Sequence, residues 1–155
     1  MPAEIFTTVT IGERTFAIKK FDAKAGLKLA RFVIAKLAPL IPMLNVGTDE
    51  NGQEKEMSDE QLYDVVGMIT ENLSDDDIDS LVDKCLRVCY EILPAGRAAV
   101  IDETGHYGVE GVEYDPVLAL RLCFEAIKWG ASAFFDGKNL ASRFAKKEAG
   151  SQQNQ

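Results

Sequence analysis

The sequence is poor in the residue patterns that most often carry enzyme chemistry. It has one histidine, His106, in 155 residues, and neither a G-x-S-x-G motif nor a Cys-and-His signature accompanies it. It also has no glycine-rich loop of the kind that binds phosphate. Paired carboxylates are abundant, but nearly all of these pairs stand where helices are expected to begin, and helix capping explains them there. We therefore expect a protein that is not an enzyme and needs no cofactor.

Cysteine is scarce, with Cys85, Cys89 and Cys123 all inside apolar helical patterns. A zinc site built from the first two and His106 would still need a fourth ligand. The acidic run that starts at Asp75 lacks the glycine and the glutamate of a calcium loop. We expect no metal site, and three reduced thiols in the core of a cytosolic protein.

Long uninterrupted hydrophobic runs are also missing. The most apolar stretch, residues 115–135, is broken by Arg121, Glu125 and Lys128, so it does not read as a membrane span. The first 13 residues have no basic segment followed by an apolar one, which argues against a signal peptide. The expected location is the cytoplasm in which the protein is made, with no membrane partner.

Positive charge is in short supply, since 17 Lys and Arg face 25 Asp and Glu and leave a net charge of −8. This disfavours nucleic acid as a partner, because such binding depends on cations that neutralise phosphates. The charge is uneven: residues 19–36 hold six basic residues and one acid, and residues 49–83 hold thirteen acids and one lysine. Such asymmetry can steer a partner or merely coat a surface, and the second is more common.

Helical spacing of apolar residues predicts about five helices. The two longest are capped by Asp22 and Asp115, and each combines a broad apolar face with one polar stripe. Leu27 belongs to the expected apolar face of the first of them. Ser58 and Ser74 start two amphipathic helices, and a short basic helix follows near the C-terminus. The expected helices cover residues 23–38, the segment that follows Ser58, the segment from Ser74 to Ile92, residues 115–135 and residues 139–147.

Two runs of β-branched and aromatic residues, Ile5–Val9 and Thr15–Lys20, predict an N-terminal hairpin. A second short hairpin between Val100-Ile101 and Tyr107–Tyr114 is possible. The expected fold class is therefore α+β, mostly α.

The expected organisation is one domain over residues 1–148, with a flexible loop at about 45–57 and a polar, disordered tail at 149–155.

The segments AGLKLARFVIAKLAPLI, which follows FDA, and LALRLCFEAIKWGASAFF resemble the tail assembly chaperones of long-tailed bacteriophages and prophages. The resemblance rests on apolar patterns at both ends of the chain. It implies a small, mostly helical cytoplasmic protein without an active site. Such a protein binds the tape-measure protein, shields its apolar helical segments and is absent from the mature virion. In many members a longer, frameshifted form recruits tail-tube subunits.

The residues themselves leave other classes open. A cytosolic helical adaptor or regulatory protein of phage or bacterial origin, without a tape-measure client, would show the same patterns. An enzyme would need a deep polar pocket in which His106 and carboxylates converge. Self-association is also possible.

The candidate partner-binding residues lie on the expected exposed edge of the helix over residues 23–38. Lys24, Lys28, Arg31 and Lys36 would attract an acidic flank of a client helix, and Phe32 would supply an apolar anchor. In the alternative interpretation the N-terminal hairpin covers Phe32, which then serves packing alone.

Overall fold

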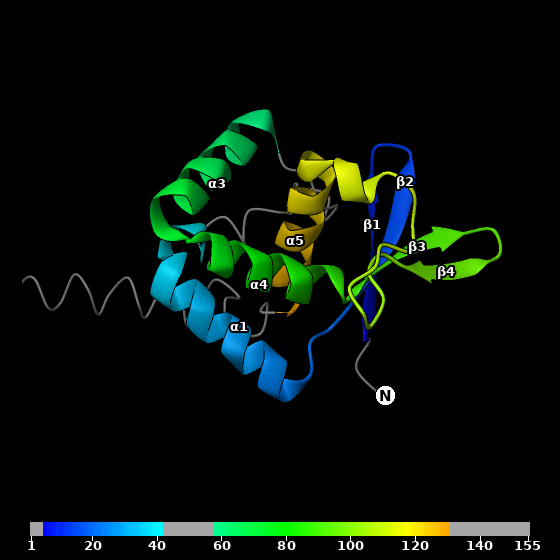
Figure 1. Ribbon diagram of the computed structural model, residues 1–155, viewed down its shortest axis with the longest axis horizontal. Helices are drawn as coiled ribbons and strands as arrows, with labels where there is room; N and C mark the ends of the chain where they lie inside the picture. The colour runs from blue at the N-terminus through cyan, green and yellow to red at the C-terminus, as the bar shows by residue number, and fades with distance from the viewer. Residues whose placement is uncertain (1–4, 42–57, 131–155) are drawn as a thin grey trace, which may run out of the picture.

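The computed structural model describes residues 5–41 and 58–130, which form four α-helices and one antiparallel sheet of four strands. Figure 1 shows α5 between the sheet on one side and α1, α3 and α4 on the other. The elements are β1 (Phe6–Ile11), β2 (Arg14–Lys19), α1 (Ala23–Lys36), α3 (Asp59–Asn72), α4 (Asp75–Leu86), β3 (Cys89–Leu93), β4 (Gly96–Ala99) and α5 (Pro116–Gly130), with short 3₁₀ helices at Ala38–Leu40 and Val112–Tyr114.

The sheet joins two hairpins that lie far apart in the sequence. Its strand order is β1-β2-β3-β4, and β2 pairs with β3 although α1, α3 and α4 separate them along the chain. Phe16 of β2 lies opposite Val9 on one side and Glu91 on the other. Phe16, Ile18 and Cys89 are fully buried and share one face of the sheet, as the two-residue period of strands requires.

Helix α5 fills the centre of the molecule. Asp115 caps it, because its Oδ1 accepts the Leu118 backbone N–H at 3.0 Å. The helix packs against β1, β2 and α4. Gly130 is required at its end, since a Cβ atom there would collide with the ring of Phe21. The buried side chains of α5 are Leu118, Leu122, Cys123, Phe124, Ala126 and Ile127.

The expected fold class is wrong in its architecture. The N-terminal hairpin is confirmed, but it forms half of a four-stranded sheet and does not stand alone beside a helical domain. The second hairpin lies at Cys89–Leu93 and Gly96–Ala99, and the segment proposed for it, residues 100–114, shows an isolated bridge between Ile101 and Tyr107. The described ranges hold four α-helices rather than five, and the one expected at 139–147 lies outside them.

The helix expected from Ser74 to Ile92 ends at Leu86 for a physical reason. The apolar residues that follow fit both a helical period and a strand, and pairing with β2 selects the strand. Gly96, with φ at +132°, then allows the turn between β3 and β4. Long-range pairing therefore overrode a local helical pattern.

The predicted helix starts are confirmed. Asp22 Oδ1 accepts the Ala25 N–H at 2.8 Å, and Ser58 and Ser74 both form capping boxes. The three cysteines are buried free thiols, also as predicted. Burial raises the pKa of Cys89. The expected loop at 45–57 and tail at 149–155 lie outside the described residues.

Candidate protein-binding surface

Helix α1 packs on one side only. Gly26, Leu29, Ala30 and Val33 are buried, and their spacing of three and four residues places them on a single face. Most of the other residues of α1 are exposed. The helix therefore has one side packed against the core and one side that is accessible to a partner.

Three predicted binding residues, Lys24, Lys28 and Arg31, lie on this outer face and are exposed. None of them forms an ion pair with another residue of the described ranges. Their positions, three or four residues apart, place the charges on successive helical turns. The outer face therefore carries a row of three cations that are available to a partner.

Leu27 lies within this row and was missed by the sequence interpretation. The expected apolar face of the helix included it, but its side chain is 58% exposed. A helical projection gives the signal that could have found it, because Leu27 lies about 40° from Arg31 and about 60° from Lys24. We define the basic face as Lys24, Leu27, Lys28 and Arg31.

Phe32 and Lys36 are placed differently. Phe32 is half-buried and packs against the core. The Lys36 ammonium lies 6.0 Å from its ring centroid and donates to Asp77 Oδ2 at 2.6 Å. This bond, together with the Ser74 backbone N–H, lowers the pKa of Asp77. Lys36 thus ties α1 to the start of α4, and the structure groups only three of the five predicted residues with Leu27.

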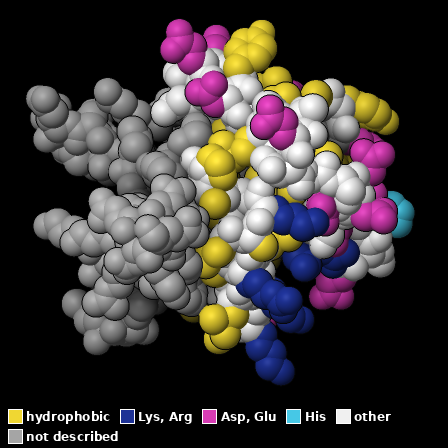
Figure 2. Space-filling model, turned by 90° about the vertical axis from the view of Figure 1, so that its left-hand side faces the viewer, with side chains coloured by type: hydrophobic (Ala, Val, Ile, Leu, Met, Phe, Trp, Pro, Cys, Tyr) yellow, Lys and Arg dark blue, Asp and Glu magenta, His cyan; other side chains and the backbone are white. Residues whose placement is uncertain are grey.

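The charges are separated over the surface. Figure 2 shows basic side chains in the centre and lower half of one face, with acidic side chains toward its top and right. The outer side of α1 carries exposed Lys24, Lys28 and Arg31 in a chain whose net charge is −8. An acidic partner segment would be attracted to these cations and repelled by the acidic parts of the surface.

His106 belongs to a hydrogen-bonded turn. Asp102 Oδ1 accepts from the Thr104 hydroxyl at 2.7 Å and from the backbone N–H groups of His106 and Thr104 at 2.9 and 2.8 Å, and these bonds lower the pKa of Asp102. The Thr104 hydroxyl lies 2.6 Å from His106 Nδ1. All three side chains are exposed, so turn formation explains the cluster.

A hollow of about 570 Å³ lies between α4 and residues 101–107, and the described side chains that line it include Asp76, Asp79, Asp83 and Tyr107 but not His106. Within the described ranges, no three His, Cys, Asp or Glu side chains are grouped to hold a metal ion. No described helix is long and apolar enough to cross a membrane.

The described residues form a small domain of helices on an antiparallel sheet, with an exposed basic face on α1. The chain belongs to the phage tail assembly chaperone family: the family model described as "Phage tail assembly chaperone protein, TAC" matches residues 12–141. The resemblance inferred from the two long helices is thereby confirmed, and the protein has a role in phage tail assembly. No curated protein and no solved structure matches the chain.

Proposed function

We propose that this chaperone binds the tape-measure protein through the basic face of α1 and keeps it soluble while the tail is assembled. Family membership supports the role in tail assembly. The observation that carries the proposed binding surface is Leu27, a largely exposed apolar side chain among three cations that form no ion pair with any described residue. The role is one of binding and needs no catalysis.

An amphipathic client helix suits this surface physically. Such helices dock by placing apolar residues against an apolar contact, and charges around the contact set their orientation. Leu27 offers the apolar contact, and the aliphatic parts of Lys24, Lys28 and Arg31 extend it. Phe32 lies at the flank of this face, where part of its ring is accessible.

The proposal extends to the wider assembly role. We place the protein in the host cytoplasm before the tail is complete and outside the mature virion, and we expect it to help recruit tail-tube subunits to the tape-measure protein. The support for these points is the family membership. A regulatory adaptor without a tape-measure client is the competing function.

Co-expression with the tape-measure protein of the same phage or prophage tests the proposal. Wild type should raise the soluble fraction of that protein, and Leu27→Asp should abolish the effect because a carboxylate would remove the apolar contact. Val66→Asp is the matched control, since Val66 is an exposed aliphatic residue of α3. Equal rescue by wild type and Leu27→Asp would remove the basic face from the site, and no rescue by wild type would favour the adaptor.

A further inference from the structure

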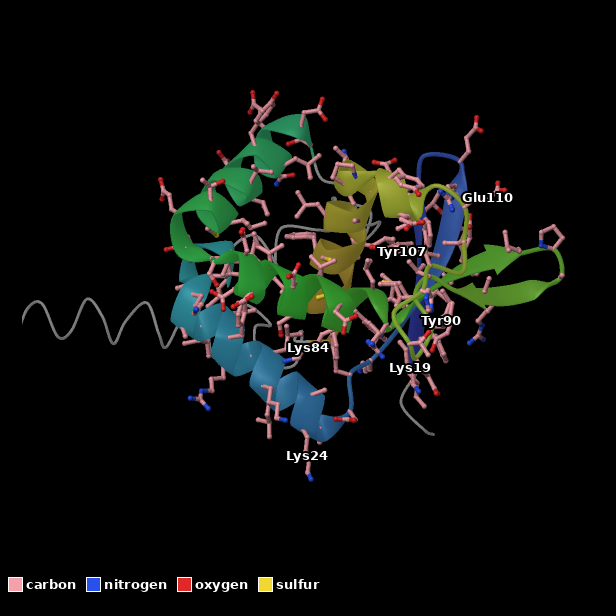
Figure 3. The ribbon with its side chains drawn as sticks, in the orientation of Figure 1. Lys19, Lys24, Lys84, Tyr90, Tyr107 and Glu110 are labelled. Carbon is pink, nitrogen blue, oxygen red and sulfur yellow. The ribbon has the colours of Figure 1, made fainter. Side chains whose placement is uncertain are left out.

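A second basic feature lies beside the first turn of α1. A groove of about 520 Å³, within the usual size range of ligand sites, opens where the end of β2, the start of α1 and the end of α4 meet. Figure 3 shows Lys84 in the space between α4 and α1, with Lys19 and Tyr90 on the sheet side of this region. Four of the lining residues are cations, Lys19, Lys20, Lys84 and Arg87.

Two of the four cations are held in place. Arg87 Nε donates to Asp83 Oδ2 at 2.9 Å, and the Lys20 ammonium lies 4.6 Å from the ring centroid of Trp129. Lys19 and Lys84 are exposed and form no ion pair within the part of the chain that the structure describes. The groove therefore has two cations on fixed side chains and two that are available to a ligand.

The rest of the groove is mainly apolar. Phe21, Val88 and Tyr90 contribute to its lining, and the ring of Tyr90 is supported by an edge-to-face contact with Phe6 at 5.9 Å. Its one acid, Asp22, caps α1 through Ala25. Four cations and one carboxylate give a lining charge of +3, in a chain whose net charge is −8.

We infer that this groove binds an acidic segment of a partner polypeptide. Carboxylates of the segment would pair with Lys19 and Lys84, and an apolar side chain beside them would contact Phe21 or Tyr90. Nucleic acid fits less well, because the surrounding protein is strongly acidic and would repel a continuous phosphate backbone.

The groove deepens the proposed function, on which it rests for the identity of the partner. Ala25 lines the groove at the first turn of α1, about 100° around the helix from Lys24 and about 160° from Leu27. A client helix on the basic face would therefore reach the groove with the segment that continues past the first turn of α1. The two contacts would together fix the direction of the client on the chaperone.

The test is fluorescence anisotropy with a short labelled peptide of glutamates around one phenylalanine. The full-length protein should bind this peptide at least about tenfold more tightly than the same peptide with glutamine in place of glutamate, and added salt should weaken the binding. Lys84→Glu and Lys19→Glu should each weaken it about fivefold or more. Lys36→Glu, which makes the same charge change at an exposed lysine outside the groove, should alter it less than about twofold.

Three results would overturn the inference: equal binding of the glutamine peptide, unchanged affinity in both lysine variants, or tighter binding of single-stranded thymidine DNA. Because the probe is synthetic, this experiment is independent of the tape-measure protein. A Leu27→Asp variant that loses the client but still binds the glutamate peptide would separate the groove from the basic face.

Discussion

Helices α1 and α5 have similar sequence patterns and different surroundings. Both begin at an aspartate cap and carry a broad apolar face. In α5, the larger side chains Leu122 and Phe124 are buried, because the sheet covers one side and α4 another. In α1, Leu27 at an equally apolar position is exposed. The comparison shows that an apolar pattern alone does not separate a core helix from one that offers a binding face.

The difference arises from the sheet. Pairing of β2 with β3 creates a surface on which Phe16, Ile18 and Cys89 meet α5. Helix α1 has no corresponding partner on its outer side within the described ranges. Substitutions in α5 should therefore mainly lower the free energy of unfolding. Substitutions on the outer side of α1 should mainly weaken the binding of the client.

The largest expected effect on stability is that of Leu122→Ala. Leu122 is fully buried in α5, and a truncation there leaves a cavity that the packed surroundings can only partly close. We expect a loss of about 2–5 kcal/mol in the free energy of unfolding, measured by denaturant titration. A loss below about 1 kcal/mol would show that α5 is not the centre of the core.

A smaller effect is expected from Glu91→Gln. Arg14 donates to both carboxylate oxygens of Glu91, at 2.8 and 2.7 Å, and also to the Glu110 carbonyl ahead of α5. Glu91 is largely buried, so the loss of its charge should cost about 2 kcal/mol. Lys36→Gln, which removes the more exposed pair of α1 with Asp77, should cost less.

The pH dependence of Tm tests the prediction for Glu91→Gln. The bond from Arg14 lowers the pKa of Glu91 below the ordinary value of 4.5. A carboxylate with a lowered pKa in the folded state contributes stability above its unfolded pKa and loses it as the pH falls further. The difference in Tm between wild type and Glu91→Gln should be largest at neutral pH. It should decrease when the pH falls below about 4.5. A constant difference would contradict the ion-pair interpretation.

Local features of the fold could be read from the sequence, and long-range ones could not. The caps at Asp22, Ser58 and Ser74 depend on residues within one helical turn, and all three are confirmed. Strand β3 was read as helix because its apolar residues fit both periods, and only pairing with β2 selects the strand.

The same limit applies to the candidate sites. The cations of α1 were visible as one row in the sequence, whereas the exposure of Leu27 depends on which side of α1 packs against the rest of the fold. The groove joins Lys19 to Lys84, residues that are 65 positions apart, and nothing in the local pattern connects them.

The most direct test of the central claim is to measure client affinity and Tm together for two variants. One is the triple variant Lys24→Glu, Lys28→Glu and Arg31→Glu on the basic face, and the other is Leu122→Ala in the core. The triple variant should keep its Tm within a few degrees and bind a purified tape-measure segment at least about tenfold more weakly. Leu122→Ala should melt well below wild type and, at a temperature where it is fully folded, bind with wild-type affinity. A triple variant that binds the segment normally, or a core variant that loses affinity while folded, would contradict the claim that α1 binds the client and α5 holds the fold.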